Sequence, residues 1–278
     1  MTTNHRSDPT TPSALTDDAA PELRDLAVHA PSGLVTSVLV EVGLADRYAP
    51  IPSPIGRLVV AWNGLGVSAV EAAPDDASFE TSHAARTGRP IHRADALPPR
   101  LGRAIERRLA GDRRVAIELD LRGRTKFERD VWRKALEIPR GEVRPYGWIA
   151  AEIGRPKAVR AVGTALGHNP VPLIVPCHRV VRSDGSLGQY SLGGPANKRT
   201  ILASEGLDPE SLEMQARAGV RYIGSDTTRI VCLPTCSAAK RIGPTHRVPF
   251  RSLDGAASAG YRTCRKCRPI SAAGNVAA

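Results

Sequence analysis

The chain has 278 residues, of which 41% are hydrophobic and 4% aromatic, and it carries a formal net charge of +11 with a pI near 10.0. This length allows about two ordinary domains with an aliphatic core, and the excess of Lys and Arg fits a polyanionic partner such as nucleic acid. We find no apolar stretch of the ~18 residues that a membrane-spanning helix needs and no signal-peptide pattern, so we expect no membrane association and a cytoplasmic location.

The N-terminal third has the pattern of a small mixed α and β subdomain. Residues 1–31 are rich in Thr, Asp, Pro and Ala and are expected to be disordered. Residues 33–44 are apolar, and their β-branched content favours a strand, with a short helix as the alternative. The next predicted elements are strands at 48–51, 57–62 and 67–71, a helix over 98–110 and a strand over 115–121. We interpret residues 45–122 as scaffold, because they show no catalytic motif.

A helix-turn-helix is predicted in the middle of the chain. Short helices over 148–153 and 157–166 are separated by Gly154-Arg155-Pro156. The second helix carries Lys157 and Arg160 in a region dense in basic residues, which is the pattern expected for contact with the DNA backbone. Ordinary helix packing is the alternative interpretation of this spacing. Further predicted segments are helices over 126–138 and 198–206 and a linker over 208–219.

Cys177 is the candidate nucleophile. An apolar run of strand-like residues leads to it, His178 follows it, and no other cysteine precedes residue 232. A free thiol has a pKa of roughly 8.5, so a neighbouring base, reached directly or through one water, is needed to raise the thiolate fraction. A buried structural cysteine beside a histidine is the alternative interpretation of this dipeptide.

The surroundings of Cys177 resemble the O6-alkylguanine-DNA alkyltransferases, which repair DNA by moving an alkyl group from guanine onto their own cysteine. Residues 176–180 match the core signature of that family, Pro-Cys-His-Arg-Val. Further matches are residues 140–146 at the start of the DNA-binding segment, residues 156–163 in the recognition helix, Tyr190-Ser191 in the closing loop, and Glu205-Gly206 in the final helix. The resemblance covers residues 45–207.

The resemblance implies a role for each matching residue. Cys177 accepts the alkyl group, His178 takes its proton through a bound water, and Glu205 orients the imidazole. Asn169 braces the cysteine loop, and Tyr146 donates a proton to the leaving guanine. The contacts to base and DNA are assigned to Arg160, Ser191, the Val180 backbone, Tyr190 and Lys157. We expect Arg160 to fill the space left by the flipped nucleotide, whose unstacking costs a few kcal/mol.

The chemistry implies a protein that acts once. Sulfur attacks an sp³ carbon in line, guanine leaves, and the thioether product is not cleaved by water. We therefore expect no cofactor for the transfer, double-stranded alkylated DNA as the partner, and a monomer.

Four cysteines near the C-terminus predict a zinc site. Cys232, Cys236, Cys264 and Cys267 form two close pairs, a pattern typical of tetrahedral Zn²⁺ with four thiolates and no open position. A module of about 50 residues with few apolar side chains is expected to fold only with metal bound. A disulfide pairing is the alternative.

This module resembles the zinc-binding domain of the bacterial adaptive-response protein Ada at residues 227–236, 247–250 and 259–264. In that family the first cysteine also removes a methyl group from a DNA phosphotriester, so the resemblance implies Cys232 as a second methyl acceptor. Two departures bear on this role. Leu233 replaces a basic residue beside the acceptor, and only residues 270–278 follow the module where a regulatory helix-turn-helix pair is usual, so we expect no transcriptional role. Anchoring the repair domain to DNA is the alternative role.

The predicted fold class is α+β. It comprises an N-terminal subdomain with a mixed sheet (45–122), a mostly helical alkyltransferase domain (123–207), the linker (208–219) and an α+β zinc module (220–270). The predicted function is single-turnover transfer from O6 of guanine, with O4 of thymine as a secondary candidate, to Cys177. A damage-sensing protein without transfer and a zinc-dependent regulator are the alternatives.

Overall fold

The protein is described by a computed structural model that covers residues 33–271, so the disorder predicted for residues 1–31 lies outside the described part. The strand favoured for residues 33–44 is wrong, because this segment forms helix α2 (Leu34–Glu41). A helix satisfies its N–H and C=O groups within the segment, whereas a strand needs a neighbouring strand. Within residues 33–271, every helix is too short or too polar to span a bilayer.

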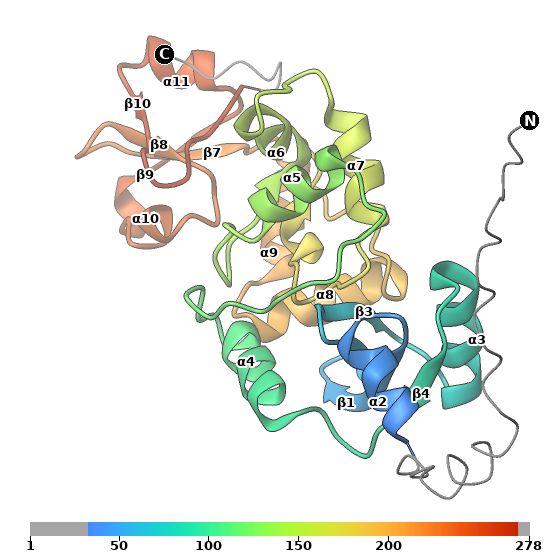
Figure 1. Cartoon of the computed structure of the whole chain (residues 1–278). Helices are drawn as coiled ribbons and strands as arrows, with labels where there is room; N and C mark the ends of the chain where they lie inside the picture. Colours follow the sequence, from blue (N-terminus) through green and yellow to red (C-terminus); the bar gives the residue numbers. More distant parts are fainter. Residues whose placement is uncertain (1–32, 272–278) are drawn as a thin grey trace, which may run out of the picture. The chain divides into compact units, whose positions relative to one another are not determined.

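The N-terminal sheet has the strand order β3-β2-β1-β4 (Figure 1). Strands β1 (Asp46–Ser53), β2 (Gly56–Asn63) and β3 (Gly66–Glu71) form an antiparallel meander, β4 (Ile91–Arg93) pairs parallel to β1, and the helices are α3 (Asp76–Thr87) and α4 (Pro99–Leu109). The three predicted strands and the helix over 98–110 are therefore confirmed. The strand predicted over 115–121 is wrong, because Leu119 makes only an isolated bridge with Val67. The carboxylate of Asp120, the next residue, accepts hydrogen bonds from Asn63 and Arg89.

The middle of the chain is helical and contains the predicted helix-turn-helix. Helices α5 (Lys126–Ala135), α6 (Tyr146–Glu152) and α7 (Val159–Gly167) share one apolar core. In that core the buried Trp132 indole donates to the Ala165 carbonyl at 2.8 Å, which ties α5 to α7. The remaining elements are β5 (Arg144–Pro145), the 3₁₀ turn η1 (Cys177–Arg179), β6 (Val180–Val181), α8 (Gly194–Ser204) and α9 (Pro209–Arg217).

Two segments of this region differ from the sequence predictions. The apolar run before Cys177 is a tight turn and not a strand, since Leu173 has φ +71° and the Val175 amide donates to the Val171 carbonyl. The linker interpretation of residues 208–219 also needs correction, because the segment contains α9. Leu212 of α9 is buried in a small cluster with Val143, Val181, Leu187 and Leu202, so α9 packs onto the helical region.

The C-terminal module has its own four-stranded sheet, in the order β10-β8-β7-β9. Its elements are β7 (Tyr222–Ser225), β8 (Ile230–Cys232), α10 (Ser237–Lys240), η2 (Pro244–His246), β9 (Arg247–Phe250), α11 (Leu253–Ser258) and β10 (Arg262–Thr263). Gly224 is required in this core, because a Cβ there would lie 2.5 Å from the Tyr261 ring and 2.7 Å from the Phe250 ring. With this module the predicted α+β fold class is confirmed.

Candidate active site and metal centre

Cys177 lies at the start of η1 and is 6% exposed. Together with other residues it lines a cavity of about 240 Å³, whose walls are Tyr146, Gly163, Leu166, Gly167, Gln189, Tyr190 and Ser191. The cavity thus lies between the start of α6, helix α7 and the loop before α8. Pockets for drug-sized ligands measure about 300–1,000 Å³, so this smaller volume suits a group the size of one nucleobase.

The Cys177 thiol is held in its neutral form. Burial raises the pKa of Cys177, although a hydrogen bond from Asn169 and the charge of Lys198 act in the opposite direction. Asn169 Nδ2 lies 3.3 Å from the sulfur and donates to the Val175 carbonyl at 3.0 Å, so one amide fixes both the thiol and the turn before it. Because the thiol is neutral at rest, attack on a carbon requires a base.

That base is available in a buried row formed by His178, Glu205 and Arg179. His178 Nε2 lies 3.0 Å from Glu205 Oε1, and the Arg179 guanidinium donates to both oxygens of the same carboxylate at 2.7–3.1 Å. Burial alone would raise the pKa of Glu205, but the hydrogen bonds from His178 and Arg179 outweigh it and lower the pKa to about 2. Burial lowers the pKa of His178, so its imidazole is neutral at pH 7. Its Nδ1 atom is buried without a protein hydrogen-bond partner, which leaves it free to receive a proton.

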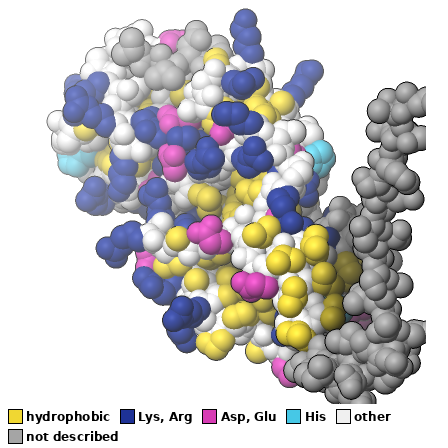
Figure 2. All heavy atoms as spheres, in the orientation of Figure 1, with side chains coloured by type: hydrophobic (Ala, Val, Ile, Leu, Met, Phe, Trp, Pro, Cys, Tyr) yellow, Lys and Arg dark blue, Asp and Glu magenta, His cyan; other side chains and the backbone are white. Residues whose placement is uncertain are grey.

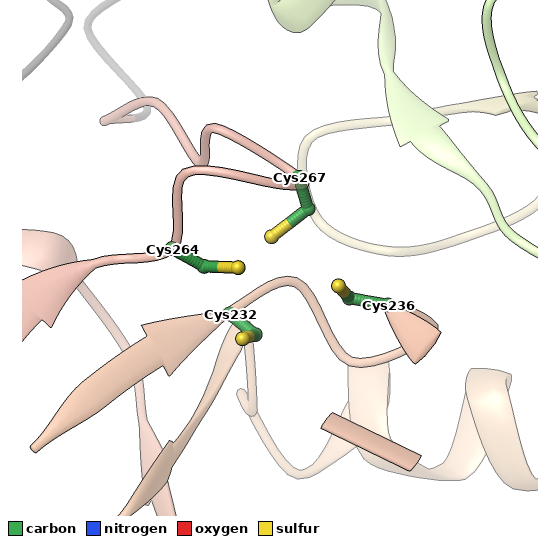
Figure 3. A group of neighbouring side chains, drawn as sticks. All are labelled: Cys232, Cys236, Cys264 and Cys267. Carbon is green, nitrogen blue, oxygen red and sulfur yellow. The ribbon is translucent and has the colours of Figure 1, made fainter. Parts of the chain in front are cut away.

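The four C-terminal cysteines form a metal centre (Figure 3). Their Sγ atoms all lie within 4.8 Å of one another, and all four residues are buried with reduced thiols. The parallel pairing of β8 with β10 brings Cys232 next to Cys264. Cys236 directly precedes α10, and Cys267 lies in the turn that follows Cys264. Tetrahedral Zn²⁺ with 2.3 Å bonds needs sulfur atoms about 3.8 Å apart, so this set fits zinc after a small contraction. All four cysteines are free, so the structure contradicts the disulfide alternative.

Comparisons with known proteins agree with both sites. The family described as "6-O-methylguanine DNA methyltransferase, DNA binding domain" matches residues 126–207, and "Metal binding domain of Ada" matches residues 213–269. The methylated-DNA–protein-cysteine methyltransferase of Mycolicibacterium paratuberculosis is 42% identical over 159 residues, which cover 57% of this chain and 92% of that protein. The chain belongs to the methylated-DNA–protein-cysteine methyltransferase family. It is therefore a stoichiometric enzyme that repairs DNA by transferring an alkyl group to cysteine.

Two other relatives extend the comparison. The bifunctional transcriptional activator/DNA repair enzyme Ada of Escherichia coli is 37% identical over 172 residues, which cover 60% of this chain and 47% of that protein. A crystal structure of Mycobacterium tuberculosis O6-methylguanine methyltransferase shares 40% identity and a TM-score of 0.48, and the match covers 58% of this chain and 92% of that one.

The methyltransferase site brings together most of the residues predicted for it. Tyr146, Tyr190 and Ser191 line the cavity with Cys177, and the buried Tyr190 hydroxyl has no protein partner. Burial raises the pKa of Tyr146, and the neighbouring Cys177 raises it further, so the phenol keeps its proton. Arg160 on α7 and Lys157 just before it are exposed and do not line this cavity. Lys and Arg side chains are numerous on the face of the molecule that Figure 2 shows.

The sequence analysis assigned no role to two charged residues of this site. Arg179 lies within the matched Pro-Cys-His-Arg-Val run, which was the available signal for it. Lys198 is fully buried and donates to the carbonyls of Val180 and Leu187, both at 2.6 Å. Burial lowers the pKa of Lys198 to about 8. Lys198 thus fixes the loop that carries Tyr190.

Proposed function

We propose that Cys177 takes a methyl or larger alkyl group from O6 of guanine in double-stranded DNA, in a single turnover. The observation that carries this proposal is the cavity of about 240 Å³ in which the Cys177 sulfur faces a phenol, two loop residues and helix α7 of the helix-turn-helix. A nucleobase reaches such a cavity only by leaving the helical stack. O4 of thymine is a secondary candidate, because a pyrimidine is smaller than the purine that the cavity suits.

The proposed reaction transfers one alkyl group and two protons. The bond between the alkyl carbon and guanine O6 breaks, and the bond between that carbon and Cys177 Sγ forms. The thiol proton passes through a water to His178 Nδ1, and the Glu205 carboxylate balances the charge of the imidazolium. Tyr146 supplies the proton that the departing guanine needs, and its phenolate regains a proton as the imidazolium loses one, so the products are the thioether and neutral guanine. Asn169 holds the sulfur in line during the attack.

The DNA contacts come from the helix-turn-helix. We propose that exposed Lys157 and Arg160 approach the duplex and that Arg160 occupies the space of the flipped nucleotide, where a guanidinium can stack on neighbouring bases. Tyr190 and Ser191 then meet the base edge. We further propose that the transfer needs no small-molecule cofactor, because the thiol itself is the acceptor, and that the protein acts as a monomer.

For the C-terminal module we propose zinc binding by Cys232, Cys236, Cys264 and Cys267 together with contact to the DNA backbone. When bound, zinc keeps its ligands as thiolates and joins the two halves of the module. A second role for Cys232 as a phosphotriester methyl acceptor is supported by its position in the module that matches Ada. Its burial, at 1% exposure, and the apolar Leu233 beside it oppose that role.

The test is to incubate the protein with duplex DNA carrying a labelled alkyl group and to locate the label by peptide mass. We expect the label on Cys177 from O6-alkylguanine. We expect Cys177→Ala to abolish this transfer while DNA binding stays within about twofold of wild type. Transfer retained by this variant would refute the assignment, and bound DNA with no labelled cysteine in wild type would favour a damage-sensing protein. Label from a methyl phosphotriester on Cys232 would establish the second acceptor.

A further inference from the structure

One stretch of backbone is shared by the two sites. It comprises residues 140–148 and is called the shared segment below. On the side of the guanine cavity it carries Tyr146, and its Gly141 amide lies 3.4 Å from Glu205 Oε2. The contacts of the zinc module with the same segment are Lys240 Nζ to the Gly141 carbonyl at 2.9 Å, the Ser237 amide to Glu142 Oε1 at 3.0 Å, the Val143 amide to Thr235 Oγ1 at 2.9 Å, and Trp148 Nε1 to the Cys267 carbonyl at 3.0 Å.

These contacts come from the loops that hold the metal ligands. Thr235 and Ser237 flank Cys236, Lys240 ends the helix that follows it, and the last contact uses the backbone of Cys267 itself. Four thiolates at this separation repel one another, so the two loops keep their positions only when a cation joins them. The anchors of the shared segment therefore depend on the metal.

The interface between the zinc module and the repair domain is packed as well as hydrogen-bonded. Ile270, three residues after the last zinc ligand, is buried in the repair-domain core, where its Cδ1 lies 3.4 Å from the position of a Cβ at Gly147. Leu233 is buried and lines a hollow together with Val143 and Pro145. This packing accounts for an apolar residue beside Cys232, since the position faces protein.

We propose that the zinc module is a positioning element for guanine repair, in which Thr235 and Lys240 hold the shared segment and thereby keep Tyr146 and Glu205 in the geometry for transfer. Loss of the metal loosens the segment and slows the transfer at Cys177. The inference rests on the proposed transfer to Cys177 but concerns different residues.

The direct test is hydrogen exchange in the full-length protein. The Val143 amide donates to Thr235 Oγ1, so we expect it to exchange on the order of tenfold faster after a chelator removes the metal, and also in Thr235→Val. The exposed Thr228→Val in the same module is the matched control and is expected to leave this amide unchanged. An exchange rate of the Val143 amide that does not change when the metal is removed would overturn the inference.

The second test separates positioning from simple destabilisation by single-turnover kinetics. We expect Thr235→Val to lower the transfer rate at saturating DNA about fivefold and to leave the half-saturating DNA concentration unchanged. In protein lacking zinc through Cys264→Ser and Cys267→Ser, Thr235→Val should have no further effect, because the two changes act through one contact. If Thr235→Val and the loss of zinc lowered the transfer rate additively, the proposal would be contradicted.

A tryptophan pair supplies an independent check. Trp148→Phe removes the hydrogen bond to Cys267, whereas Trp132→Phe removes an equally buried bond to Ala165 within the repair domain. Only Trp148→Phe should reduce, without abolishing, the dependence of the transfer rate on zinc, because the contacts of Thr235 and Lys240 remain, and equal behaviour of the two variants would count against the inference. Wild-type transfer that persists unchanged without metal overturns this inference alone. If no cysteine of the wild-type protein receives the alkyl label, the proposed function is wrong. The hydrogen-exchange rate of the Val143 amide then still tests the inference.

Discussion

The charge on Glu205 should contribute measurably to the stability of the fold. Its side chain is 7% exposed, balances the charge of Arg179, which is 7% exposed, and accepts a hydrogen bond from His178, which is 1% exposed. The difference between the ordinary carboxyl pKa of 4.5 and a value of about 2 corresponds to about 3 kcal/mol. Breaking a buried pair typically costs about 3–5 kcal/mol, so Glu205→Gln should lower the free energy of unfolding by about 3 kcal/mol at pH 7.

The pH dependence of this loss follows from the direction of the pKa change. The pKa of Glu205 is lower in the folded protein, so its contribution is complete above about pH 4.5 and disappears as the pH falls towards 2. The difference between wild type and Glu205→Gln should therefore shrink to about 1.5 kcal/mol at pH 3. Denaturant unfolding monitored by tryptophan fluorescence at pH 7, 5, 4 and 3 measures it.

A surface variant provides the control for this experiment. Glu213 pairs with Arg199, which is 45% exposed, and such pairs contribute less than about 1 kcal/mol. Glu213→Gln should thus have a small effect. A loss in Glu205→Gln that is no larger than in Glu213→Gln, or that stays constant from pH 7 to pH 3, would refute the electrostatic reasoning.

Three further predictions concern the metal, the core of its module and the DNA. Purified protein should contain one zinc per chain by metal analysis, and Cys264→Ser with Cys267→Ser should contain none; metal-free wild type would contradict the site. Gly224→Ala should destabilise the module by about 1–3 kcal/mol in thermal unfolding, because its Cβ would lie 2.5 Å from an aromatic ring, whereas the Cβ in Gly243→Ala would make only an ordinary contact, 3.8 Å from His246, and should be neutral. Arg160→Ala should slow repair of duplex DNA about tenfold without changing the reaction with a free O6-alkylguanine base, and equal slowing of both would exclude a role in base flipping.

Local patterns were sufficient where the determinants are close in the sequence. The meander of β1 to β3 follows from alternating apolar runs and glycine turns, and α5 begins at the capping box of Thr125 and Glu128. The candidate nucleophile and the candidate zinc ligands were predicted in the same way, because Cys177 lies in a contiguous motif and the four C-terminal cysteines lie in two close pairs. The errors at 115–121 and 208–219 have a different cause, since Leu119 meets Val67 and α9 packs on residues that are distant in the sequence. At 33–44 the β-branched content favoured a strand, but the segment forms a helix that satisfies its own backbone groups.

The sequence by itself determined the family, the candidate nucleophile and the candidate metal ligands, because their side-chain chemistry and short spacing can be recognised in consecutive residues. Only the tertiary structure decided how these groups are joined. Lys198 is buried beneath the loop that carries Tyr190. The zinc loops contact residues 140–148 across 92 positions of the chain, between Val143 and Thr235, to 119 positions, between Trp148 and Cys267. Such contacts depend on how whole elements pack, and a buried hydrogen bond between distant residues has no local pattern from which it can be predicted.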